Sequence, residues 1–295
     1  MPTQTAFKLT DGARPPVQPF KTQLLKWVGN KQRFAAEIVS SFPAQIGTYY
    51  EPFLGSAAVL GTFAHHQSVG SDAFEPLVGI WQMLLESPDT LSGWYRERWE
   101  LIETMGKREA YSSVLRSFNE GPNAADFVFL CRSCYGGIVR FRKSDGAMST
   151  PCGPHMPISP DSFARRVETW YDRVCKVKFV HCDYRESMQS AKRGDLIYCD
   201  PPYTDSQKIL YGAQAFALQE LMQEIEKCKQ RGVRVVLSID GTKRSGEKLC
   251  DVGIPSGLFE SEIFIDVGRS MLRRFQMNGQ TLEKEQVSDR LLLTY

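Results

Sequence analysis

The chain has 295 residues, of which 42% are hydrophobic and 24% charged, and its formal net charge is +2. This composition predicts a soluble globular protein with a sizeable core, built as one large domain or two modest ones. No apolar run approaches the roughly 18 residues of a membrane span, and residues 1–20 lack the basic start and apolar core of a signal peptide. Eight cysteines without such a signal indicate reduced thiols, so we expect a cytoplasmic protein with no membrane partner.

The first part of the chain alternates helices and strands. Residues 1–20 carry prolines and polar side chains and are expected to form a flexible extension. The elements expected next are a helix within 22–40 beyond a loop at Gly29–Asn30, a strand at 47–50, a helix at 56–64 and a strand at 68–71. A strand, a glycine loop, a helix and a second strand ending in an acid are typical of half of a nucleotide-binding sheet.

Two acids mark the strand ends in this half. Glu51 follows the first strand and Asp72 ends the second, 21 residues later. In Rossmann-type units an acid about 20 residues beyond the glycine loop binds the ribose hydroxyls. The segment from Glu51 to Gly55 has one glycine rather than three, which argues against a dinucleotide because a pyrophosphate needs close approach to the backbone.

Residues 87–172 interrupt the alternation. They carry three of the five tryptophans and a turn-rich centre at 136–160, with a hairpin expected near Ser144–Gly146. The elements expected after this block are strands at 177–182 and 196–199, a helix at 215–231 that stops at Gly232, and strands at 233–239 and 291–295. We therefore predict an α/β, Rossmann-like catalytic domain formed by 21–86 and 174–295, and an inserted, mostly helical domain at 87–173.

The tetrapeptide Asp200-Pro201-Pro202-Tyr203 directly follows the apolar run at 196–199. Ligands of open α/β sheets bind at the carboxyl ends of the strands, where this segment lies. The Asp200 carboxylate and the Pro201 carbonyl can accept the two hydrogens of an exocyclic amine, and Tyr203 can stack on its ring. The pattern favours group transfer to a flat, amine-bearing ring such as adenine, with a plain proline-rich turn as the alternative.

Basic residues gather in two acid-free stretches of an otherwise balanced chain. Residues 127–144 hold four basic side chains and no acid, and a second stretch holds Arg269, Arg273 and Arg274. Local basic patches of this kind are typical of a protein with one surface that faces nucleic acid. A solvated face without a partner is the alternative.

Four segments, in their order along the chain, resemble Dam-type DNA adenine-N6 methyltransferases of the α group. They are Leu25-Lys26-Trp27-Val28-Gly29-Asn30-Lys31, Glu51-Pro52-Phe53-Leu54-Gly55, Asp72 and Asp200-Pro201-Pro202-Tyr203. The resemblance covers roughly residues 23–295. It implies a Rossmann-like, S-adenosylmethionine-dependent methyltransferase sheet with an inserted target-recognition domain at 87–173.

The resemblance also implies residue roles. Asp200, Pro201 and Tyr203 are expected to be catalytic. The residues expected to bind S-adenosylmethionine are Trp27, Lys31, Glu51, Phe53, Gly55, Asp72, Asp183 and Asp200. Trp27 is expected to cover the cofactor, and Lys31 to bind its carboxylate or shape the loop, against the alternative of a core tryptophan and a surface lysine on one helical face. Asp183 ends a strand and faces the cofactor's adenine or forms a plain turn.

Residues 129–137, followed by Arg140, resemble the target-recognition region of the family. The residues expected to contact DNA are Arg132, Tyr135, Arg140, Arg142 and Lys143. Two positions depart from the family pattern. Gly136 stands where asparagine is usual, which puts DNA contacts at that turn in question, and Ala57 replaces a second glycine, which is expected to narrow the cofactor pocket slightly.

The cysteines offer an alternative site. Cys131 and Cys134, with Cys152 and His155, have spacings found in zinc sites. We expect no metal, because the first pair falls in a segment that resembles a metal-free helix and free cysteines are common as small buried hydrophobes. A cysteine nucleophile is not required either, since an exocyclic amine can attack a methyl group directly.

The function predicted from these features is site-specific, adenine-specific DNA methylation: transfer of a methyl group from S-adenosylmethionine to adenine N6 in double-stranded DNA, with the target base flipped into the pocket. A cognate restriction endonuclease, within a restriction-modification system, is a further partner that the resemblance allows. The alternatives are an RNA adenine methyltransferase and a non-catalytic nucleic-acid-binding module on the same fold. The intact tetrapeptide at Asp200 argues against the last.

Overall fold

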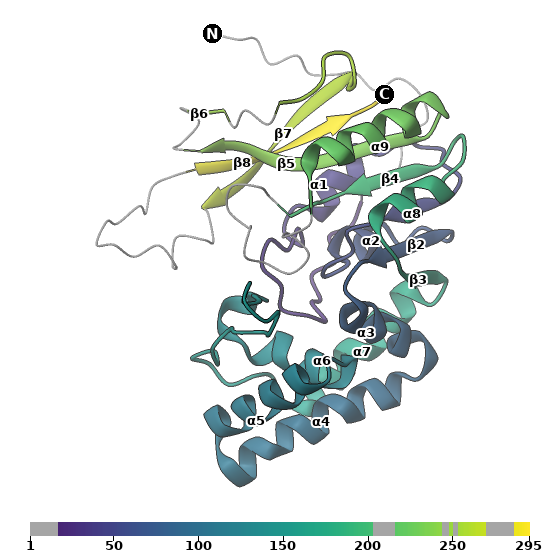
Figure 1. Cartoon of the computed structure of the whole chain (residues 1–295). Helices are drawn as coiled ribbons and strands as arrows, with labels where there is room; N and C mark the ends of the chain where they lie inside the picture. The colour runs from purple at the N-terminus through teal and green to yellow at the C-terminus, as the bar shows by residue number, and fades with distance from the viewer. Residues whose placement is uncertain (1–16, 203–215, 244–247, 250–252, 270–285) are drawn as a thin grey trace.

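The computed structural model describes residues 17–202, 216–243, 248–249, 253–269 and 286–295. Its centre is a sheet with strand order β3-β2-β1-β4-β5-β8-β7, and β6 pairs with β5 (Figure 1). The strands are β1 (Tyr49–Glu51), β2 (Ser68–Asp72), β3 (Val177–His181), β4 (Leu196–Cys199), β5 (Arg234–Lys243), β6 (Lys248–Leu249), β7 (Ser261–Arg269) and β8 (Gln286–Leu293). This architecture confirms the predicted α/β class.

Five neighbouring strands of the sheet are parallel, in the spatial order β3, β2, β1, β4 and β5. By contrast, β8 runs antiparallel to both β5 and β7. β1 lies between β2 and β4, so the strand order reverses at the β1–β4 pair. In open α/β sheets the crevice at such a reversal, beyond the carboxyl ends of the strands, is where ligands bind.

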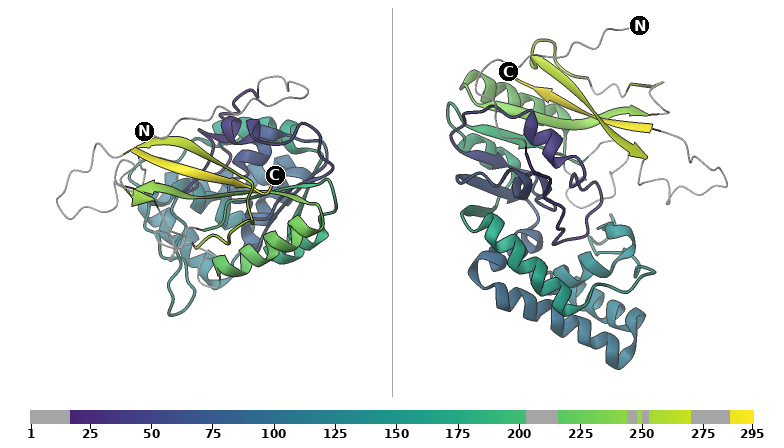
Figure 2. Two further views of the ribbon diagram at one scale, coloured as in Figure 1. Left: turned by 90° about the horizontal axis from the view of Figure 1, so that it is seen from above. Right: turned by 180° about the vertical axis from the view of Figure 1, so that it is seen from behind.

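Helices cover both faces of the sheet and extend beyond its β3 edge. They are α1 (Ala35–Ser40), α2 (Ala58–Phe63), α3 (Glu75–Glu86), α4 (Pro88–Met105), α5 (Lys107–Glu120), α6 (Ala124–Ser133), the 3-10 helix η1 (Tyr135–Gly137), α7 (Pro160–Val174), α8 (Tyr184–Ser190) and α9 (Leu218–Gln230). α8 and α9 pack on the face opposite α1 and α2. The helices α4 to α7 form a block beyond β3, and α3 joins this block to the sheet (Figures 1 and 2).

Burial on both faces explains the apolar central strands. Every residue of β4 is buried, and its alternate side chains enter two different hydrophobic clusters. Leu196 and Tyr198 join the cluster with α1 and α2, whereas Ile197 and Cys199 join the one with α8 and α9. A parallel strand covered by helices on both sides has this near-continuous apolar sequence rather than an alternating one.

Local capping fixes where several helices begin and end. Ser87 precedes Pro88 of α4, and its hydroxyl accepts the Thr90 N–H at 3.3 Å. Gly232 ends α9 with φ +75°, a left-handed conformation that glycine adopts without a steric penalty. Both boundaries follow from sequence, because serine caps, prolines in the first turn and terminal glycines have mechanical reasons for their positions.

The helical block and the sheet share one core. Trp81 of α3 packs against Trp170 of α7 with ring centroids 4.9 Å apart, and both are fully buried. A Cβ added to Gly61 of α2 would lie 2.6 Å from the Trp170 ring, so α2 must carry a glycine there. One hydrophobic cluster runs from Phe129 of α6 to Tyr198 of β4. The division at residues 87 and 173 therefore stays a prediction about chain organisation.

Two sequence expectations differ from the structure near the N-terminus. The predicted helix within 22–40 forms only as α1, because Asn30 Oδ1 accepts the Gln32 N–H at 2.7 Å in a local turn. The expected flexible extension falls mostly outside the described residues, but Phe20 at its end packs edge-on against Trp170, with centroids 5.0 Å apart. Within the part of the chain that the structure describes, no helix is long and apolar enough to cross a membrane.

Candidate active site

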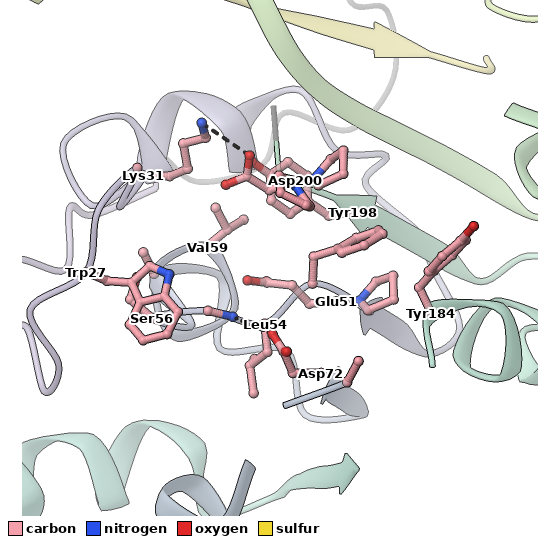
Figure 3. A pocket seen from close by; sticks show the side chains of 18 of the residues that line it. Trp27, Lys31, Glu51, Leu54, Ser56, Val59, Asp72, Tyr184, Tyr198 and Asp200 are labelled. Carbon is pink, nitrogen blue, oxygen red and sulfur yellow. Dashed lines mark hydrogen bonds and ion pairs between the residues drawn. The ribbon is translucent and has the colours of Figure 1, made fainter. Parts of the chain in front are cut away.

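A cavity of about 280 Å³ opens at the carboxyl ends of β1, β2, β3 and β4, where the strand order reverses. Its walls come from the loops after these strands and from the loop before α1 (Figure 3). The sequence-predicted site residues that line it are Trp27, Lys31, Glu51, Phe53, Gly55, Asp72, Asp183, Asp200 and Pro201. The structure thus brings together residues that lie up to 174 positions apart, from Trp27 to Pro201.

Glu51 is a buried acid at the end of β1. Its side chain accepts the Tyr49 hydroxyl hydrogen bond at 2.7 Å, and the residue is 3% exposed. Burial raises the pKa of Glu51 to about 8, the Tyr49 hydrogen bond opposes this rise, and the charge of Asp200 adds to it. This shift favours the protonated form of Glu51, and a cation in the cavity would favour its ionised form.

Asp72 is held rigidly by backbone donors. Its two carboxylate oxygens accept the N–H groups of Gly55 at 3.2 Å and Phe74 at 3.1 Å. Gly55 has φ +45°, and a Cβ added there would lie 3.1 Å from Trp27 Nε1. Trp27 in turn packs edge-on against Phe127, with ring centroids 6.2 Å apart. Because Gly55 has no side chain, the Trp27 indole can lie close to it while the Gly55 N–H donates to the Asp72 carboxylate.

Lys31 faces the Asp200 carboxylate. Its Nζ lies 3.2 Å from Asp200 Oδ1 and 2.8 Å from Asp289 Oδ2 of β8, and the lysine side chain is 7% exposed. Trp27 and Lys31 both line the cavity, but from a loop rather than from one face of a helix. Sequence reasoning missed Asp289, because no motif surrounds it and 258 residues separate it from Lys31.

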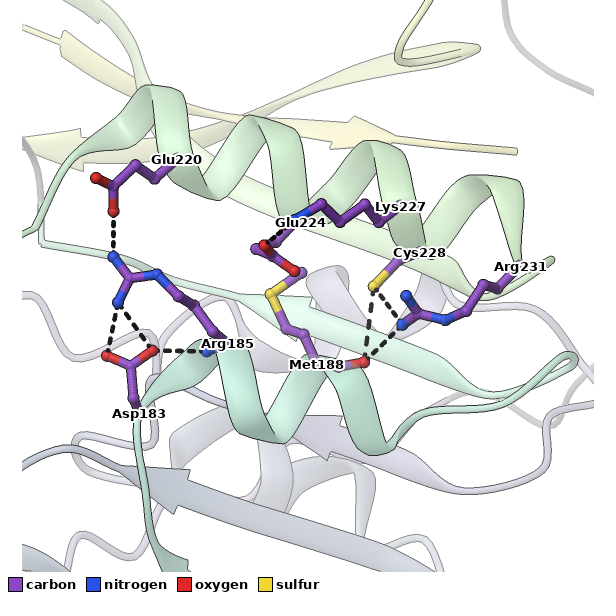
Figure 4. A network of polar contacts seen from close by, with 8 residues as sticks. All are labelled: Asp183, Arg185, Met188, Glu220, Glu224, Lys227, Cys228 and Arg231. Atoms are coloured by element: carbon purple, nitrogen blue, oxygen red, sulfur yellow. Dashed lines mark hydrogen bonds and ion pairs between the residues drawn. The ribbon is translucent and has the colours of Figure 1, made fainter.

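Asp183 caps α8 and closes one side of the cavity. Its Oδ1 accepts the Arg185 N–H at 2.9 Å, and the Arg185 guanidinium lies 3.2 Å from both carboxylate oxygens (Figure 4). Arg185 also pairs with Glu220 of α9, so it ties α8 to α9. Both the helix-cap role and a cofactor-facing role remain compatible with this position.

Aromatic side chains that the sequence did not single out complete this wall. Tyr184 stacks on Phe53 with centroids 5.2 Å apart and an interplanar angle of 26°. Phe216 meets Phe53 edge-on at 5.8 Å. All three line the cavity, and together they form an apolar surface that suits a flat ring. The one available clue was the position of Tyr184, directly after the strand-end acid Asp183.

Most of the residues expected to contact DNA are exposed beyond the helical block. Tyr135 is 37% exposed, and Arg140, Arg142 and Lys143 are exposed as well. The expected hairpin forms, with an antiparallel bridge between Phe141 and Met148. Arg142 donates two hydrogen bonds to the Asp145 carboxylate, at 3.0 and 2.7 Å, so part of the positive charge is matched within the hairpin.

Arg132 occupies a different environment. Its guanidinium is half-buried and donates to the carbonyl oxygens of Gln23 and Leu24 at 3.4 Å. Burial lowers the pKa of Arg132 from its usual range. This placement does not support the expected DNA contact: the side chain holds the segment that leads to Trp27.

The two departures from the family pattern have conformational consequences. Gly136 has φ 68° and ψ 2°, a region that glycine and asparagine both enter, so either residue suits this turn. Ala57 has φ 53°, is fully buried and does not line the cavity. The expectation that Ala57 narrows the pocket is therefore wrong, because Ala57 is not among the residues that line it, and the cost of an alanine at this φ is backbone strain.

The turn after α6 supports the wall of the cavity. Gly137 accepts the Val28 N–H at 3.0 Å, and a Cβ added to Gly137 would lie 2.9 Å from the Lys26 carbonyl. Gly137 has φ 69°, a left-handed conformation that glycine adopts without a steric penalty. The helical block thus contacts the loop that carries Trp27 without an intervening side chain.

The cysteine cluster does not form a ligand set. Cys134 and Cys152 are bridge partners on adjacent extended segments, Cys131 is buried in α6 and His155 is exposed. Among the described residues, no group of three or more histidine, cysteine or acidic side chains is arranged to hold a metal ion. Tyr203, Arg273 and Arg274 lie outside the described residues, as does the side chain of Arg269.

Comparison with known proteins gives a consistent set of matches. A family model described as D12 class N6 adenine-specific DNA methyltransferase matches residues 27–255. The chain is 26% identical over 227 residues to a DNA adenine methylase of Vibrio cholerae, covering 72% of this chain and 79% of that protein. A DNA adenine methylase of Haemophilus influenzae is 25% identical over 256 residues, covering 79% and 86%. The type II methyltransferase M.MjaIII of Methanocaldococcus jannaschii is 27% identical over 207 residues, covering 63% and 69%.

Proposed function

The chain belongs to the D12 class N6 adenine-specific DNA methyltransferase family, and from this premise we propose that its cavity binds S-adenosylmethionine beside the target adenine. The mixed α/β sheet is consistent with a fold of S-adenosylmethionine-dependent methyltransferases. One observation carries the proposal: a single cavity collects an acid from the end of each of four parallel strands, together with the Pro201 backbone. Both the donor and the acceptor of a methyl group can be held there.

The charge of the cavity suits the cofactor. S-adenosylmethionine carries a sulfonium cation and an α-amine, and the cavity presents Glu51, Asp72 and Asp200. Asp72 is fixed by two backbone donors, and an ionised carboxylate retains lone pairs with which to accept ribose hydroxyls. The volume of about 280 Å³ falls just below the range of about 300–1,000 Å³ that small-molecule sites occupy.

Polar and aromatic groups in the walls fit the two ends of the cofactor. Asn30 Nδ2 is buried, and no described atom accepts a hydrogen bond from it. Asn30 lines the cavity, so this amide is suited to donate to the cofactor's carboxylate. The stacked pair of Phe53 and Tyr184 offers an apolar surface to the adenine ring at the other end.

When bound there, S-adenosylmethionine supplies a methyl group on a positively charged sulfur. Asp200 and the Pro201 carbonyl accept the two hydrogens of the adenine amine, which directs the nitrogen lone pair away from the ring plane. As the nitrogen bonds to the methyl carbon, the carbon–sulfur bond would break and leave a neutral thioether. The nitrogen must also lose one proton, which the Asp200 carboxylate would be placed to accept. Proline fixes the backbone dihedral at Pro201, so this acceptor is oriented before the base enters.

The exposed hairpin supports recognition of duplex DNA. Arg140, Arg142 and Lys143 project from the 141–148 hairpin and its approach, where guanidinium and ammonium groups can reach phosphates or base edges. The target adenine must leave the stack to reach Asp200. Because one relative is named as a type II methyltransferase, a cognate restriction endonuclease is a further partner that we propose for this chain.

Calorimetry with S-adenosylmethionine tests the cofactor site. We expect binding by the wild-type chain and a loss of about tenfold or more in affinity for Asp72→Asn, because a hydrogen bond to a charged group is worth about 1.5–3 kcal/mol. The control is Asp161→Asn, an exposed carboxylate on α7 that does not line the cavity. Equal affinity in Asp72→Asn and the control would contradict the assignment.

The nucleic acid is tested by competition. Duplex DNA and a structured RNA are mixed in equal amounts with tritiated S-adenosylmethionine and the wild-type chain. We expect the label in DNA. Label in RNA alone would support the RNA alternative, and cofactor binding without any transfer would support a non-catalytic module.

A further inference from the structure

Lys31 joins two carboxylates that come from distant parts of the chain. Its Nζ lies 2.8 Å from Asp289 Oδ2 on β8 and 3.2 Å from Asp200 Oδ1 after β4. The three side chains are 7%, 14% and 22% exposed, for Lys31, Asp289 and Asp200 respectively. Ion pairs that are this little exposed add little net stability, because the cost of removing the charges from water offsets their attraction. A role in fixing the positions of the charged groups is therefore the natural one to test.

Asp289 lies on the face of β8 whose leucines share a hydrophobic cluster with Trp27 and α1. Side chains alternate along β8, so Asp289 shares a face with Leu291 and Leu293. Both leucines belong to the hydrophobic cluster that contains Trp27 and the apolar residues of α1. Arg290 lies on the opposite face and pairs with Glu262 of β7 at 3.1 Å.

The backbone is irregular where Asp289 sits. The register between β5 and β8 shifts between Asp240 and Thr242, opposite Asp289 and Ser288. A second shift, between Asp266 and Gly268, interrupts the pairing of β7 with β8 one to two residues away. β-bulges increase local twist and re-aim side chains, and they are over-represented next to active sites.

We propose that Asp289 is a positioning residue for methyl transfer: its carboxylate holds the Lys31 ammonium, and the ammonium holds the Asp200 carboxylate toward the adenine amine. This inference rests on the proposed function of Asp200. Lysine has a flexible four-carbon stem, so one carboxylate alone leaves the ammonium several rotamers. A second carboxylate on a strand of the sheet selects one of them.

The charges around Asp200 give the inference a directional test. The ionisable side chains around Asp200 include Lys31 from the loop before α1, Glu51 from β1 and Cys199, its neighbour in the chain, and Asp289 from β8 acts on it through Lys31. Removing the negative charge of Asp289 favours the ionised form of Asp200, whereas removing the positive charge of Lys31 disfavours it. A general loosening of the site predicts no such opposition of sign.

The experiment measures single-turnover methyl transfer to duplex DNA as a function of pH, together with the Kd of S-adenosylmethionine. For Asp289→Asn we expect a rate between about 10-fold and 100-fold below wild type, because small misplacements of a reacting group cost this much. We expect the Kd to change by less than about threefold. The low-pH limb should move to lower pH in Asp289→Asn and to higher pH in Lys31→Met.

Glu262→Gln is the matched control. It removes a carboxylate from an ion pair on the other face of the same two strands and lines no part of the cavity. We expect its rate and pH profile to equal those of wild type. A wild-type rate and an unmoved limb in Asp289→Asn would overturn the inference while leaving the proposed function intact. Absence of transfer by the wild-type chain would instead contradict the proposed function itself.

A second variant covers failure of the first to fold. Asp289→Glu keeps the charge on a side chain one methylene longer, so we expect it to fold, to transfer methyl groups more slowly than wild type and to keep the low-pH limb in place. A wild-type rate in this variant would overturn the positioning role, because the geometry would not matter.

Discussion

Glu51 makes the stability of the fold depend on pH in an unusual direction. Burial raises its pKa from 4.5 to about 8, so the folded chain keeps a proton that the unfolded chain loses above pH 4.5. The free energy of unfolding falls with rising pH wherever the folded state binds more protons than the unfolded state. The contribution of Glu51 is therefore fully present below pH 4.5, declines as the pH rises and is lost by about pH 8.

The difference between the two pKa values corresponds to about 5 kcal/mol of unfolding free energy, and this contribution is lost between about pH 4.5 and pH 8. Buried acids also relax and admit water, which lowers the observed cost. We expect a measured loss of about 2–5 kcal/mol between pH 4.5 and pH 8.5, a large part of the 5–15 kcal/mol typical of folded domains.

The substitution Glu51→Gln isolates this effect. Glutamine keeps the shape and an oxygen that can accept the Tyr49 hydroxyl, but it does not titrate. Urea unfolding of both proteins from pH 5 to pH 8.5 should give nearly equal stabilities at pH 5 and a variant more stable by about 2–5 kcal/mol at pH 8.5. A constant difference across this range would refute the reasoning. S-adenosylmethionine should also bind more weakly to this variant, because glutamine cannot supply the negative charge that a cationic cofactor would draw from Glu51.

Three glycine or alanine positions give further predictions. Ala57→Gly should raise the free energy of unfolding by about 1 kcal/mol in urea titrations, because φ 53° strains alanine. Gly55→Ala should weaken cofactor binding in calorimetry by about tenfold, since φ is +45° and the new methyl group would lie 3.1 Å from Trp27 Nε1. Gly137→Ala should cost about 1–3 kcal/mol in the same titrations, because its methyl group would meet the Lys26 backbone at 2.9 Å. No loss of stability in Gly137→Ala would contradict the packing of this turn on the loop.

The parts of the site that follow strand ends were predictable. A buried parallel strand is a local apolar run, and its carboxyl end points into the same crevice as those of its neighbours. Asp200 follows such a run, and Glu51 and Asp72 end shorter predicted strands, so sequence reasoning expected the three acids near one another and the structure brings them to one cavity. The expected strand at 196–199 coincides with β4 for the same reason.

The parts that depend on long-range pairing were not predictable. β7 contains the strand-forming residues Ile263, Phe264 and Ile265, but its sequence does not indicate which strand it pairs with, and among the described residues that partner is β8. Asp289 acquires meaning only when β8 brings it to Lys31. Arg132 shows the same limit, since its charge suggested a surface position whereas its guanidinium holds two backbone carbonyls.

Identification of the methylated nucleoside tests the central claim most directly. Duplex DNA is incubated with S-adenosylmethionine and either the wild-type chain or Asp200→Asn, digested to nucleosides and analysed by mass spectrometry. The account predicts N6-methyladenine with wild type and less than about a tenth of that amount with Asp200→Asn, because a positioned acid–base group contributes about 100-fold or more. A methyl group on another base, or N6-methyladenine at more than about a tenth of the wild-type level in Asp200→Asn, would contradict it.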